Sequence, residues 1–175
     1  MDHERLKRWV DASQSLERFH EMMLHPAQQL GRLDCRLRAE SPSFAAWNVE
    51  RAMAFQEHLM LAYLWVLGGY ELVRTVDECF RKTSDASPLA SRAKMVKKAF
   101  ERVRIPLAKF EPSRAHQHTD SSFAWPAYRP ESGVAWQVTH GTFVSRAELA
   151  DELLGLLEAM MVASPGAQDS SAGAP

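Results

Sequence analysis

The sequence predicts a mainly α-helical protein, a helical bundle around one long central helix, with a small antiparallel β-hairpin or three-strand meander before the C-terminal helix. Three observations predict this fold class. Phe44–Lys82 contains no proline and repeats apolar side chains at helical spacing. Val134–Thr139 alternates apolar and polar side chains, which is typical of a half-buried strand. The sequence Ser145-Arg146-Ala147-Glu148 is a capping box, and it opens a final helix rich in leucine.

The central helix is the most apolar part of the chain. Between His58 and Glu71 it carries no charge and is apolar on all sides, so it belongs inside a bundle or a membrane. At a rise of about 1.5 Å per residue, this run is too short to cross a membrane core of about 30 Å. We therefore expect other helices to cover it and expect no membrane contact. The Gly68-Gly69 pair is a place where the helix could bend.

Two helices are expected before the central one. Asp2–Leu24 has an amphipathic pattern, and His25-Pro26 should interrupt it because a residue before proline avoids helical geometry. Proline suits a helix start, so a second helix is expected over Pro26–Ala39. Ser41-Pro42-Ser43 then predicts a break and a cap for the central helix.

A further helix is expected to run from Leu89 to about Arg104, where Pro106 should end or kink it. Glu111–Asp120 has the composition of a loop. The meander follows, with a weaker strand over Phe123–Tyr128 and a tight turn at His140-Gly141 between the last two strands. Trp125 and Trp136 are expected to be the exposed aromatic side chains of this meander.

At 175 residues the chain is long enough for one domain with a real core. We expect a helical-bundle domain over residues 1–162, with the β-hairpin inserted at about 122–144, and a disordered tail at 163–175, which is rich in Ser, Pro, Gly and Ala. The two cysteines show no metal-site or disulfide spacing, and the charged N-terminus shows no signal peptide. These features predict a cytoplasmic protein without a cofactor or a metal.

The charge of the chain is uneven. Its formal net charge is -1, which gives no general attraction to nucleic acid or to anionic membranes. Residues 89–114, however, hold eight basic and two acidic side chains. On the expected helix Lys94, Lys98 and Arg102 form an outward row that could bind phosphates. No aromatic side chain is interleaved with this row, so base stacking is not expected there, and a solvated helix face is the alternative.

One short segment resembles a known motif. Arg102-Val103-Arg104-Ile105-Pro106-Leu107-Ala108-Lys109-Phe110-Glu111 resembles the signature of the HEPN superfamily, an arginine followed after four to six residues by a histidine. Those proteins are helical bundles, often dimeric, and many are metal-independent ribonucleases of toxin or phage-defence systems. The resemblance implies that Arg104 stabilises an RNA phosphate and that Lys109 stands at the position of the catalytic histidine.

Two departures from the motif weaken the catalytic expectation. Lysine titrates near pH ~10.4 unless its surroundings lower the pKa, so Lys109 is a poor general base. Ile105 also replaces the usual polar residue. His116 or His118 could supply the missing base, and His116, His118 and Asp120 could bind a metal if that segment were extended; a solvated loop is the alternative.

Other charged residues have structural alternatives as well. Arg104 could form an ion pair with Glu71, Asp77 or Glu78 of the central helix instead of binding phosphate. Glu71 and Arg74 could line a cleft opposite Arg104, or could simply support their own helix as an i,i+3 pair. His58, beside the apolar run, is expected to be a hydrogen-bonded core histidine.

Two functional hypotheses follow. The first is a HEPN-like protein that binds RNA and whose ribonuclease activity, which would be metal-independent, is weak or lost. The second is a non-enzymatic helical interaction module, either a homodimer or a subunit bound to a protein partner, because the central helix is more apolar than its length requires. The position of Arg104 separates them, since an exposed Arg104 favours phosphate binding and a paired Arg104 favours a structural role.

Overall fold

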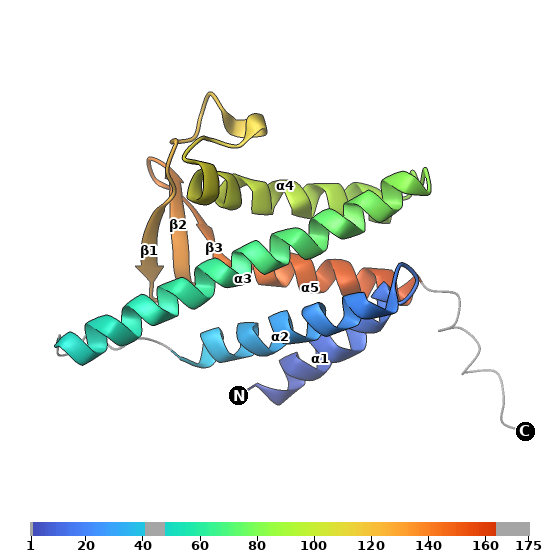
Figure 1. Cartoon of the computed structure of the whole chain (residues 1–175), viewed down its shortest axis with the longest axis horizontal. Coiled ribbons are helices and arrows are strands. Elements are labelled where there is room, and N and C mark those ends of the chain that lie inside the picture. Colours follow the sequence, from blue (N-terminus) through green and yellow to red (C-terminus); the bar gives the residue numbers. More distant parts are fainter. Residues whose placement is uncertain (1, 41–47, 164–175) are drawn as a thin grey trace, which may run out of the picture.

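The computed structural model describes residues 2–40 and 48–163. The described part contains five α-helices and one antiparallel sheet, which confirms the predicted fold class (Figure 1). The helices are α1 (His3–Ser13), α2 (Leu24–Ala39), α3 (Val49–Lys82), α4 (Pro88–Lys109) and α5 (Arg146–Val162), and the strands are β1 (Trp125–Arg129), β2 (Gly133–Thr139) and β3 (Thr142–Ser145). The expected break at 41–43 and all but the first residue of the expected tail lie outside the described residues.

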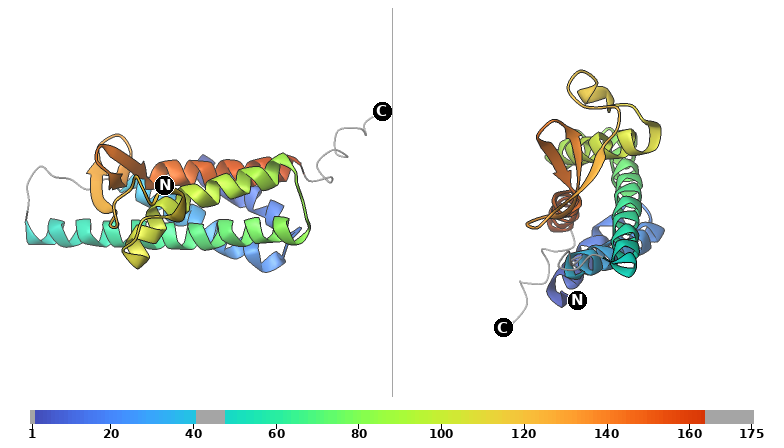
Figure 2. Two further views of the ribbon diagram at one scale, coloured as in Figure 1. Left: turned by 90° about the horizontal axis from the view of Figure 1, so that it is seen from above. Right: turned by 90° about the vertical axis from the view of Figure 1, so that its left-hand side faces the viewer.

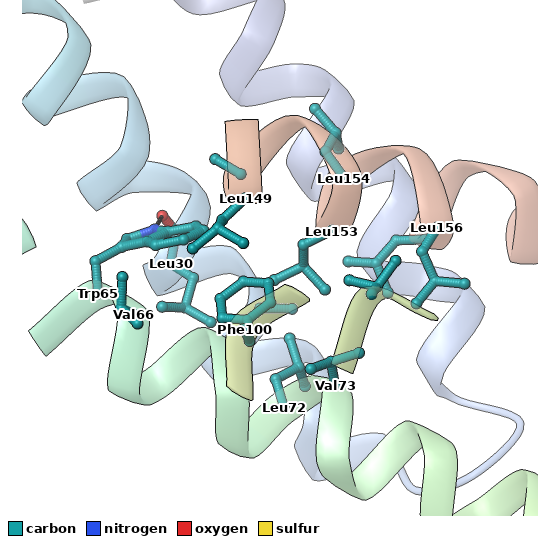
Figure 3. Packing of buried hydrophobic residues seen from close by; sticks show 14 of the residues in the cluster. Leu30, Trp65, Val66, Leu72, Val73, Phe100, Leu149, Leu153, Leu154 and Leu156 are labelled. Atoms are coloured by element: carbon teal, nitrogen blue, oxygen red, sulfur yellow. Dashed lines mark hydrogen bonds between the residues drawn. The ribbon is translucent and has the colours of Figure 1, made fainter. Parts of the chain in front are cut away.

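The long helix α3 runs along the whole bundle, with α4 on one side of it and α1 and α2 on the other (Figures 1 and 2). Helix α5 packs against α1 and α4, and the small sheet lies at one end of α4 and α5. The core forms where α3, α4 and α5 meet (Figure 3). There the Phe100 ring of α4 stacks on Trp65 of α3 with centroids 5.8 Å apart, close to Leu153 of α5.

Helix α3 begins at Val49, because the Asn48 side chain accepts a hydrogen bond from the Arg51 backbone N–H at 2.9 Å and caps the helix. The predicted start at Phe44 is outside the described residues. The helix continues through Gly68-Gly69, and Gly69 leaves room for Phe100, whose ring would lie 2.6 Å from a Cβ there. By length and composition α3 could cross a membrane, and 39% of its most apolar segment is buried in the bundle.

The single helix expected over Asp2–Leu24 was wrong. Helix α1 ends at Ser13, and two 3₁₀ turns, Gln14–Leu16 and Glu21–Met23, reverse the chain so that α2 packs against α1. The hydroxyls of Ser13 and Ser15 donate to nearby backbone carbonyls, which competes with continued helix. The second helix expected over Pro26–Ala39 is confirmed as α2, but the interruption lies before His25-Pro26, since α2 already starts at Leu24 and places Pro26 in its first turn, where no N–H donor is needed.

The end predicted for α4 near Arg104 was wrong too. The helix continues through the buried Pro106 to Lys109. It ends at Phe110, whose φ of 58° and ψ of 37° are left-handed and cannot extend a helix. Proline removes one backbone donor but leaves the following turn intact when packing holds it in place.

The sheet has the order β1-β2-β3 with antiparallel neighbours. Pro126 pairs with Trp136 and is tolerated because β1 is an edge strand. Trp125 is 63% exposed, as expected, whereas the exposure expected for Trp136 was wrong, since β2 is the central strand and its Trp136 side chain faces the core. The predicted capping box is confirmed, with the Ser145 and Glu148 side chains each bonded to the other residue's backbone N–H.

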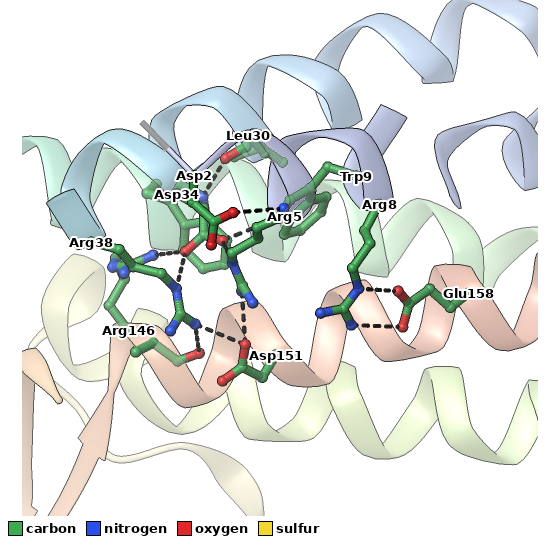
Figure 4. A network of polar contacts seen from close by, with 12 residues as sticks. Asp2, Arg5, Arg8, Trp9, Leu30, Asp34, Arg38, Arg146, Asp151 and Glu158 are labelled. Carbon is green, nitrogen blue, oxygen red and sulfur yellow. Dashed lines mark hydrogen bonds and ion pairs between the residues drawn. The ribbon is translucent and has the colours of Figure 1, made fainter. Parts of the chain in front are cut away.

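A buried ion cluster joins α1, α2 and α5 (Figure 4). At its centre is Asp34, whose side chain is completely buried. Its two carboxylate oxygens accept hydrogen bonds from the side chains of Arg5, Trp9, Arg38 and Arg146 at 2.5–3.0 Å. Burial alone would raise the pKa of Asp34, but the arginines, Arg146 first, lower it below its usual value.

Replacing Gly31 by alanine is expected to destabilise the protein by about 1–3 kcal/mol, because its Cβ would lie 2.5 Å from Cβ and Cγ of the buried Trp9. Gly155→Ala is the matched control, since its close neighbour is only the flexible tip of Arg92. Urea unfolding of the two variants measures the difference. Equal stability of both would contradict the tight packing of α1 on α2.

Candidate functional site

The outward row of α4 divides into two free lysines and one paired arginine. Lys94 and Lys98 are exposed, and neither has a carboxylate partner within the described part of the chain. Arg102 instead binds Asp120 with two hydrogen bonds of 2.7 and 3.0 Å. Burial would raise the pKa of Asp120, and the Arg102 guanidinium lowers it overall. Arg102 therefore ties the loop after α4 to the helix and is not free to bind phosphate.

Arg104 has no carboxylate partner among the described residues, so the ion pair considered for it was wrong. Its guanidinium lies over the Tyr70 ring of α3, 5.0 Å from the ring centroid. The acidic side chains expected to pair with it have other partners, since Asp77 contacts Lys97 at 2.5 Å and Glu78 contacts Arg74 at 2.9 Å. A partly exposed guanidinium on an aromatic ring keeps its charge available to an anion.

Glu71 and Arg74 form a ladder on the surface of α3 and do not point towards Arg104. Arg74 donates to Glu71 and to Glu78, both at 2.9 Å, and all three side chains are more than one-third exposed. Such i,i+3 and i,i+4 pairs support the helix that carries them. The alternative of local helix support therefore describes these two residues better than a cleft.

The HEPN-like constellation is not assembled on one side of α4. Arg104 and Lys109 are five residues apart in a continuous helix, so their side chains leave it about 140° apart. Lys109 is exposed and lies 3.9 Å from Glu111. Within the described residues, the His118 ring is hydrogen-bonded to its neighbour Gln117, at 2.9 Å between the two Nε2 atoms.

His116 lies with Arg102 and Lys98 instead, in a pocket of about 340 Å³ between α4 and α5. Its Nδ1 is 3.0 Å from Ser113 Oγ, which fixes the ring. Two acidic side chains of α5, Glu148 and Glu152, line the same pocket. Burial raises the pKa of Glu152, and the charge of Glu148 raises it further. The structure thus places two of the predicted cations, Lys98 and Arg102, and one histidine beside carboxylates, which repel phosphate.

The alternative of a metal site at His116, His118 and Asp120 was wrong. The segment is not extended, since Arg114–His116 is a 3₁₀ turn, and Asp120 is bound by Arg102. The described residues contain no group of three His, Cys, Asp or Glu side chains that could hold a metal ion.

An exposed aromatic stack at the end of α4 was missed by the sequence analysis. The rings of Phe110 and Phe123 are nearly parallel, with centroids 5.8 Å apart and an angle of 11°. Trp125 packs edge-on against Phe123 with centroids 4.9 Å apart. Phe110 and Trp125 are 68% and 63% exposed, so this stack faces solvent. The signal in the sequence was Phe123-x-Trp125 in the strand expected over Phe123–Tyr128, where alternation would place both rings on one side, although β1 itself begins only at Trp125.

We call Lys109, Phe110, Phe123 and Trp125 the aromatic–cationic surface. A phenylalanine in the left-handed region costs about 1–2 kcal/mol relative to a helical conformation, so an exposed one there calls for a functional reason. Here that conformation turns the ring away from α4 and onto Phe123. Lys109, the residue just before it, adds an exposed positive charge to the same end of the helix.

Comparison with protein-family models, with curated proteins and with solved structures gives no match.

Proposed function

We propose that the protein binds single-stranded RNA through the aromatic–cationic surface and does not cleave it. The observation that carries the proposal is the exposed stack of Phe110, Phe123 and Trp125 beside Lys109. Proteins that bind single strands combine aromatic rings, on which bases stack, with positive charges along the backbone path. The row of Lys94 and Lys98 lacks this combination, because no aromatic ring is interleaved with its cations.

The positive side chains of α4 supply the path for the phosphates. Lys94, Lys98 and Lys109 leave the helix within about 60° of one another, so they form a row that leads to Phe110. Glu101 lies on the same side of α4, and Lys98 is close to the pocket that holds Glu148 and Glu152, so Lys94 and Lys109 are the main phosphate contacts of the row. The row spans about 22 Å along the axis at about 1.5 Å per residue, which is the length of several nucleotides. Arg104, with its charge unpaired by any described carboxylate, lies on the neighbouring side of the same helix.

The proposal keeps the RNA partner that the HEPN resemblance implies and leaves out cleavage. A general base has to lie within hydrogen-bond reach of the proton it removes, close to the group that stabilises the phosphate. Arg104 and Lys109 point in different directions, and His116 is held in a pocket that contains two carboxylates. The residues that the motif needs are therefore spread over different surfaces.

The test is a binding and cleavage assay with labelled single-stranded RNA of mixed sequence. Wild type is expected to bind it and to leave it intact with and without a chelator, and Trp125→Ala to bind on the order of tenfold more weakly, because stacking contributes about 1–3 kcal/mol per base. Met22→Ala, which removes an equally exposed apolar side chain outside the aromatic–cationic surface, is the control and should bind as wild type does. Equal affinity of Trp125→Ala and wild type would count against the proposal.

The second candidate function is a homodimer formed by α3. The N-terminal part of α3 extends beyond the rest of the bundle (Figure 2), and four of its apolar side chains are exposed. These are Val49 at 78%, Met53 at 69%, Met60 at 56% and Leu64 at 49%. Further along, the exposed face changes to the ion-pair ladder of Glu71, Arg74 and Glu78, so the apolar face has a defined end.

These four side chains are spaced symmetrically along α3, so the apolar faces of two antiparallel copies would match. Val49 and Leu64 are equally far from the midpoint between Gln56 and Glu57, and so are Met53 and Met60. If two copies of α3 lie antiparallel around a two-fold axis at that point, Val49 meets the other copy's Leu64, and Met53 meets its Met60.

Sedimentation velocity at micromolar concentration tests this dimer. Wild type is expected to sediment as a dimer, and Met53→Glu as a monomer, because two buried charges would face apolar side chains. Met95→Glu on α4 has a similar exposure and should remain dimeric. A monomeric wild type would exclude the dimer while leaving RNA binding open.

A further inference from the structure

A second, smaller pocket lies between the end of α2, the β1–β2 turn and the first turn of α5. Its volume is about 200 Å³, and its lining includes Arg38, His58, Ser132 and Arg146. No residue of the aromatic–cationic surface lines it. Whatever this pocket binds is therefore independent of the RNA contacts proposed above.

Arg146 offers unused donors to this pocket. The residue is only 4% exposed, and its guanidinium lies over the Trp65 ring at 5.4 Å. One nitrogen, Nη1, donates to Asp34 at 2.5 Å. Nε and Nη2 have no acceptor anywhere in residues 2–40 and 48–163. A guanidinium has five N–H donors, and those that Asp34 does not use remain available to an acceptor in the pocket that Arg146 lines.

The charges around the pocket leave an excess of one positive charge. The cluster contains three arginines, Arg5, Arg38 and Arg146, and two carboxylates, Asp34 and Asp151 (Figure 4). Glu131 also lines the pocket, but its charge is balanced by Arg129, which donates to it at 2.6 Å. Buried charges are stable when they are paired, so this site favours an anion.

Two further side chains of the lining lack a hydrogen-bond partner among the described residues. The His58 ring is 7% exposed and packs edge-on against Tyr128 at 6.5 Å, and the Ser132 hydroxyl forms no bond there. Burial lowers the pKa of His58, so at neutral pH the ring is uncharged and still has one N–H donor. His58 is therefore buried, as expected, but its ring has no hydrogen-bond partner among the described residues, so that part of the expectation was wrong.

We propose that this pocket binds a small oxyanion, to which Arg146, His58 and Ser132 donate hydrogen bonds while Arg38 contributes charge. Arg–oxyanion bonds are among the strongest that proteins make, because donor and acceptor are both charged. The pocket is smaller than the ~300–1,000 Å³ of sites for drug-sized ligands, so it admits an inorganic phosphate or a small carboxylate and excludes a nucleotide. The first N–H groups of α5, at Arg146 and Ala147, add the positive end of a helix dipole.

The test uses calorimetric titration and thermal unfolding of the full chain with inorganic phosphate and, separately, with acetate. Sodium chloride at equal ionic strength is the reference. Wild type is expected to bind one of the two anions and to melt at a higher temperature in its presence. The phosphate and acetate arms show which oxyanion the pocket accepts. Ser132→Ala and His58→Leu are expected to weaken that binding at least tenfold, and Ser121→Ala, an exposed serine outside the pocket, should not.

Three results would overturn the proposal. One is the lack of any gain in melting temperature over sodium chloride with either anion. Another is equal affinity of wild type, Ser132→Ala and His58→Leu, and the third is an equal loss in Ser121→Ala. If His58→Leu does not fold, Ser132→Ala decides alone. Ser132→Ala should still bind RNA as wild type does, so a loss of anion binding in this variant can be distinguished from a failure of the proposed RNA function.

Discussion

Replacing Asp34 by asparagine is expected to lower the free energy of unfolding by about 3–5 kcal/mol, because the buried Arg146 and the largely buried Arg5 would lose the carboxylate that compensates them, and the more exposed Arg38 would lose a partner. An amide has the same shape but carries no charge, and its nitrogen cannot accept the hydrogen bonds of Arg5 and Trp9. The loss would affect α1, α2 and α5 together, since the cluster joins all three helices.

Urea unfolding of Asp34→Asn and wild type between pH 3 and pH 8 measures this loss. The pKa of Asp34 is lowered in the folded protein, so its stabilisation is fully present above the unfolded pKa of about 3.9 and is lost as the pH falls through the folded pKa. The two proteins should therefore differ most at neutral pH and converge in acid. Asp11→Asn is the control, since Asp11 is half-exposed and pairs only with Lys7, and it should change stability by less than about 0.5 kcal/mol.

Phe110→Asn is expected to weaken RNA binding on the order of tenfold while leaving the fold intact. Asparagine tolerates the left-handed conformation that Phe110 adopts, so the end of α4 is preserved and only the ring is lost. A variant that lost both stability and affinity would show that the stack supports the fold and would remove it as a reason for RNA binding.

Lys109→Gln separates charge from stacking on the same surface. If Lys109 contacts one phosphate, its loss should lower the salt dependence of binding, log K against log salt, by about 0.7 for a single strand. Phe110→Asn should leave this slope unchanged. The matched control is Lys82→Gln, which changes an exposed lysine at the C-terminal end of α3. An unchanged slope in Lys109→Gln would exclude a phosphate contact there.

The main elements of the fold could be predicted because their patterns are local. The apolar run of α3, the alternation of β2 and the capping box of α5 each need only neighbouring residues. The errors came where tertiary packing overrides local preference. Pro106 should stop or kink a helix, yet α4 continues past this buried proline to Lys109, and α1 ends at Ser13 where the apolar period alone predicts continuation.

The candidate sites were harder to predict, because each joins segments far apart in the sequence. Phe110 contacts Phe123 only because the loop after α4 folds back, and no local sequence pattern predicts this contact. The Arg104 motif shows the opposite case, since Arg104 and Lys109 are only five positions apart in the sequence but leave the helix on different sides. Asp34 and Arg146 are 112 residues apart, and no local pattern marks either as a partner.

The most direct test of RNA binding by the aromatic–cationic surface is a ¹H–¹⁵N NMR titration with a short single-stranded RNA, observed at the tryptophan indole N–H groups. We expect the Trp125 indole signal to shift as RNA is added. The signals of Trp9 and Trp65 should stay in place, because their indoles are buried and bonded to Asp34 and to the Leu30 carbonyl. RNA that binds without moving the Trp125 signal, or that shifts none of the signals, would contradict the account.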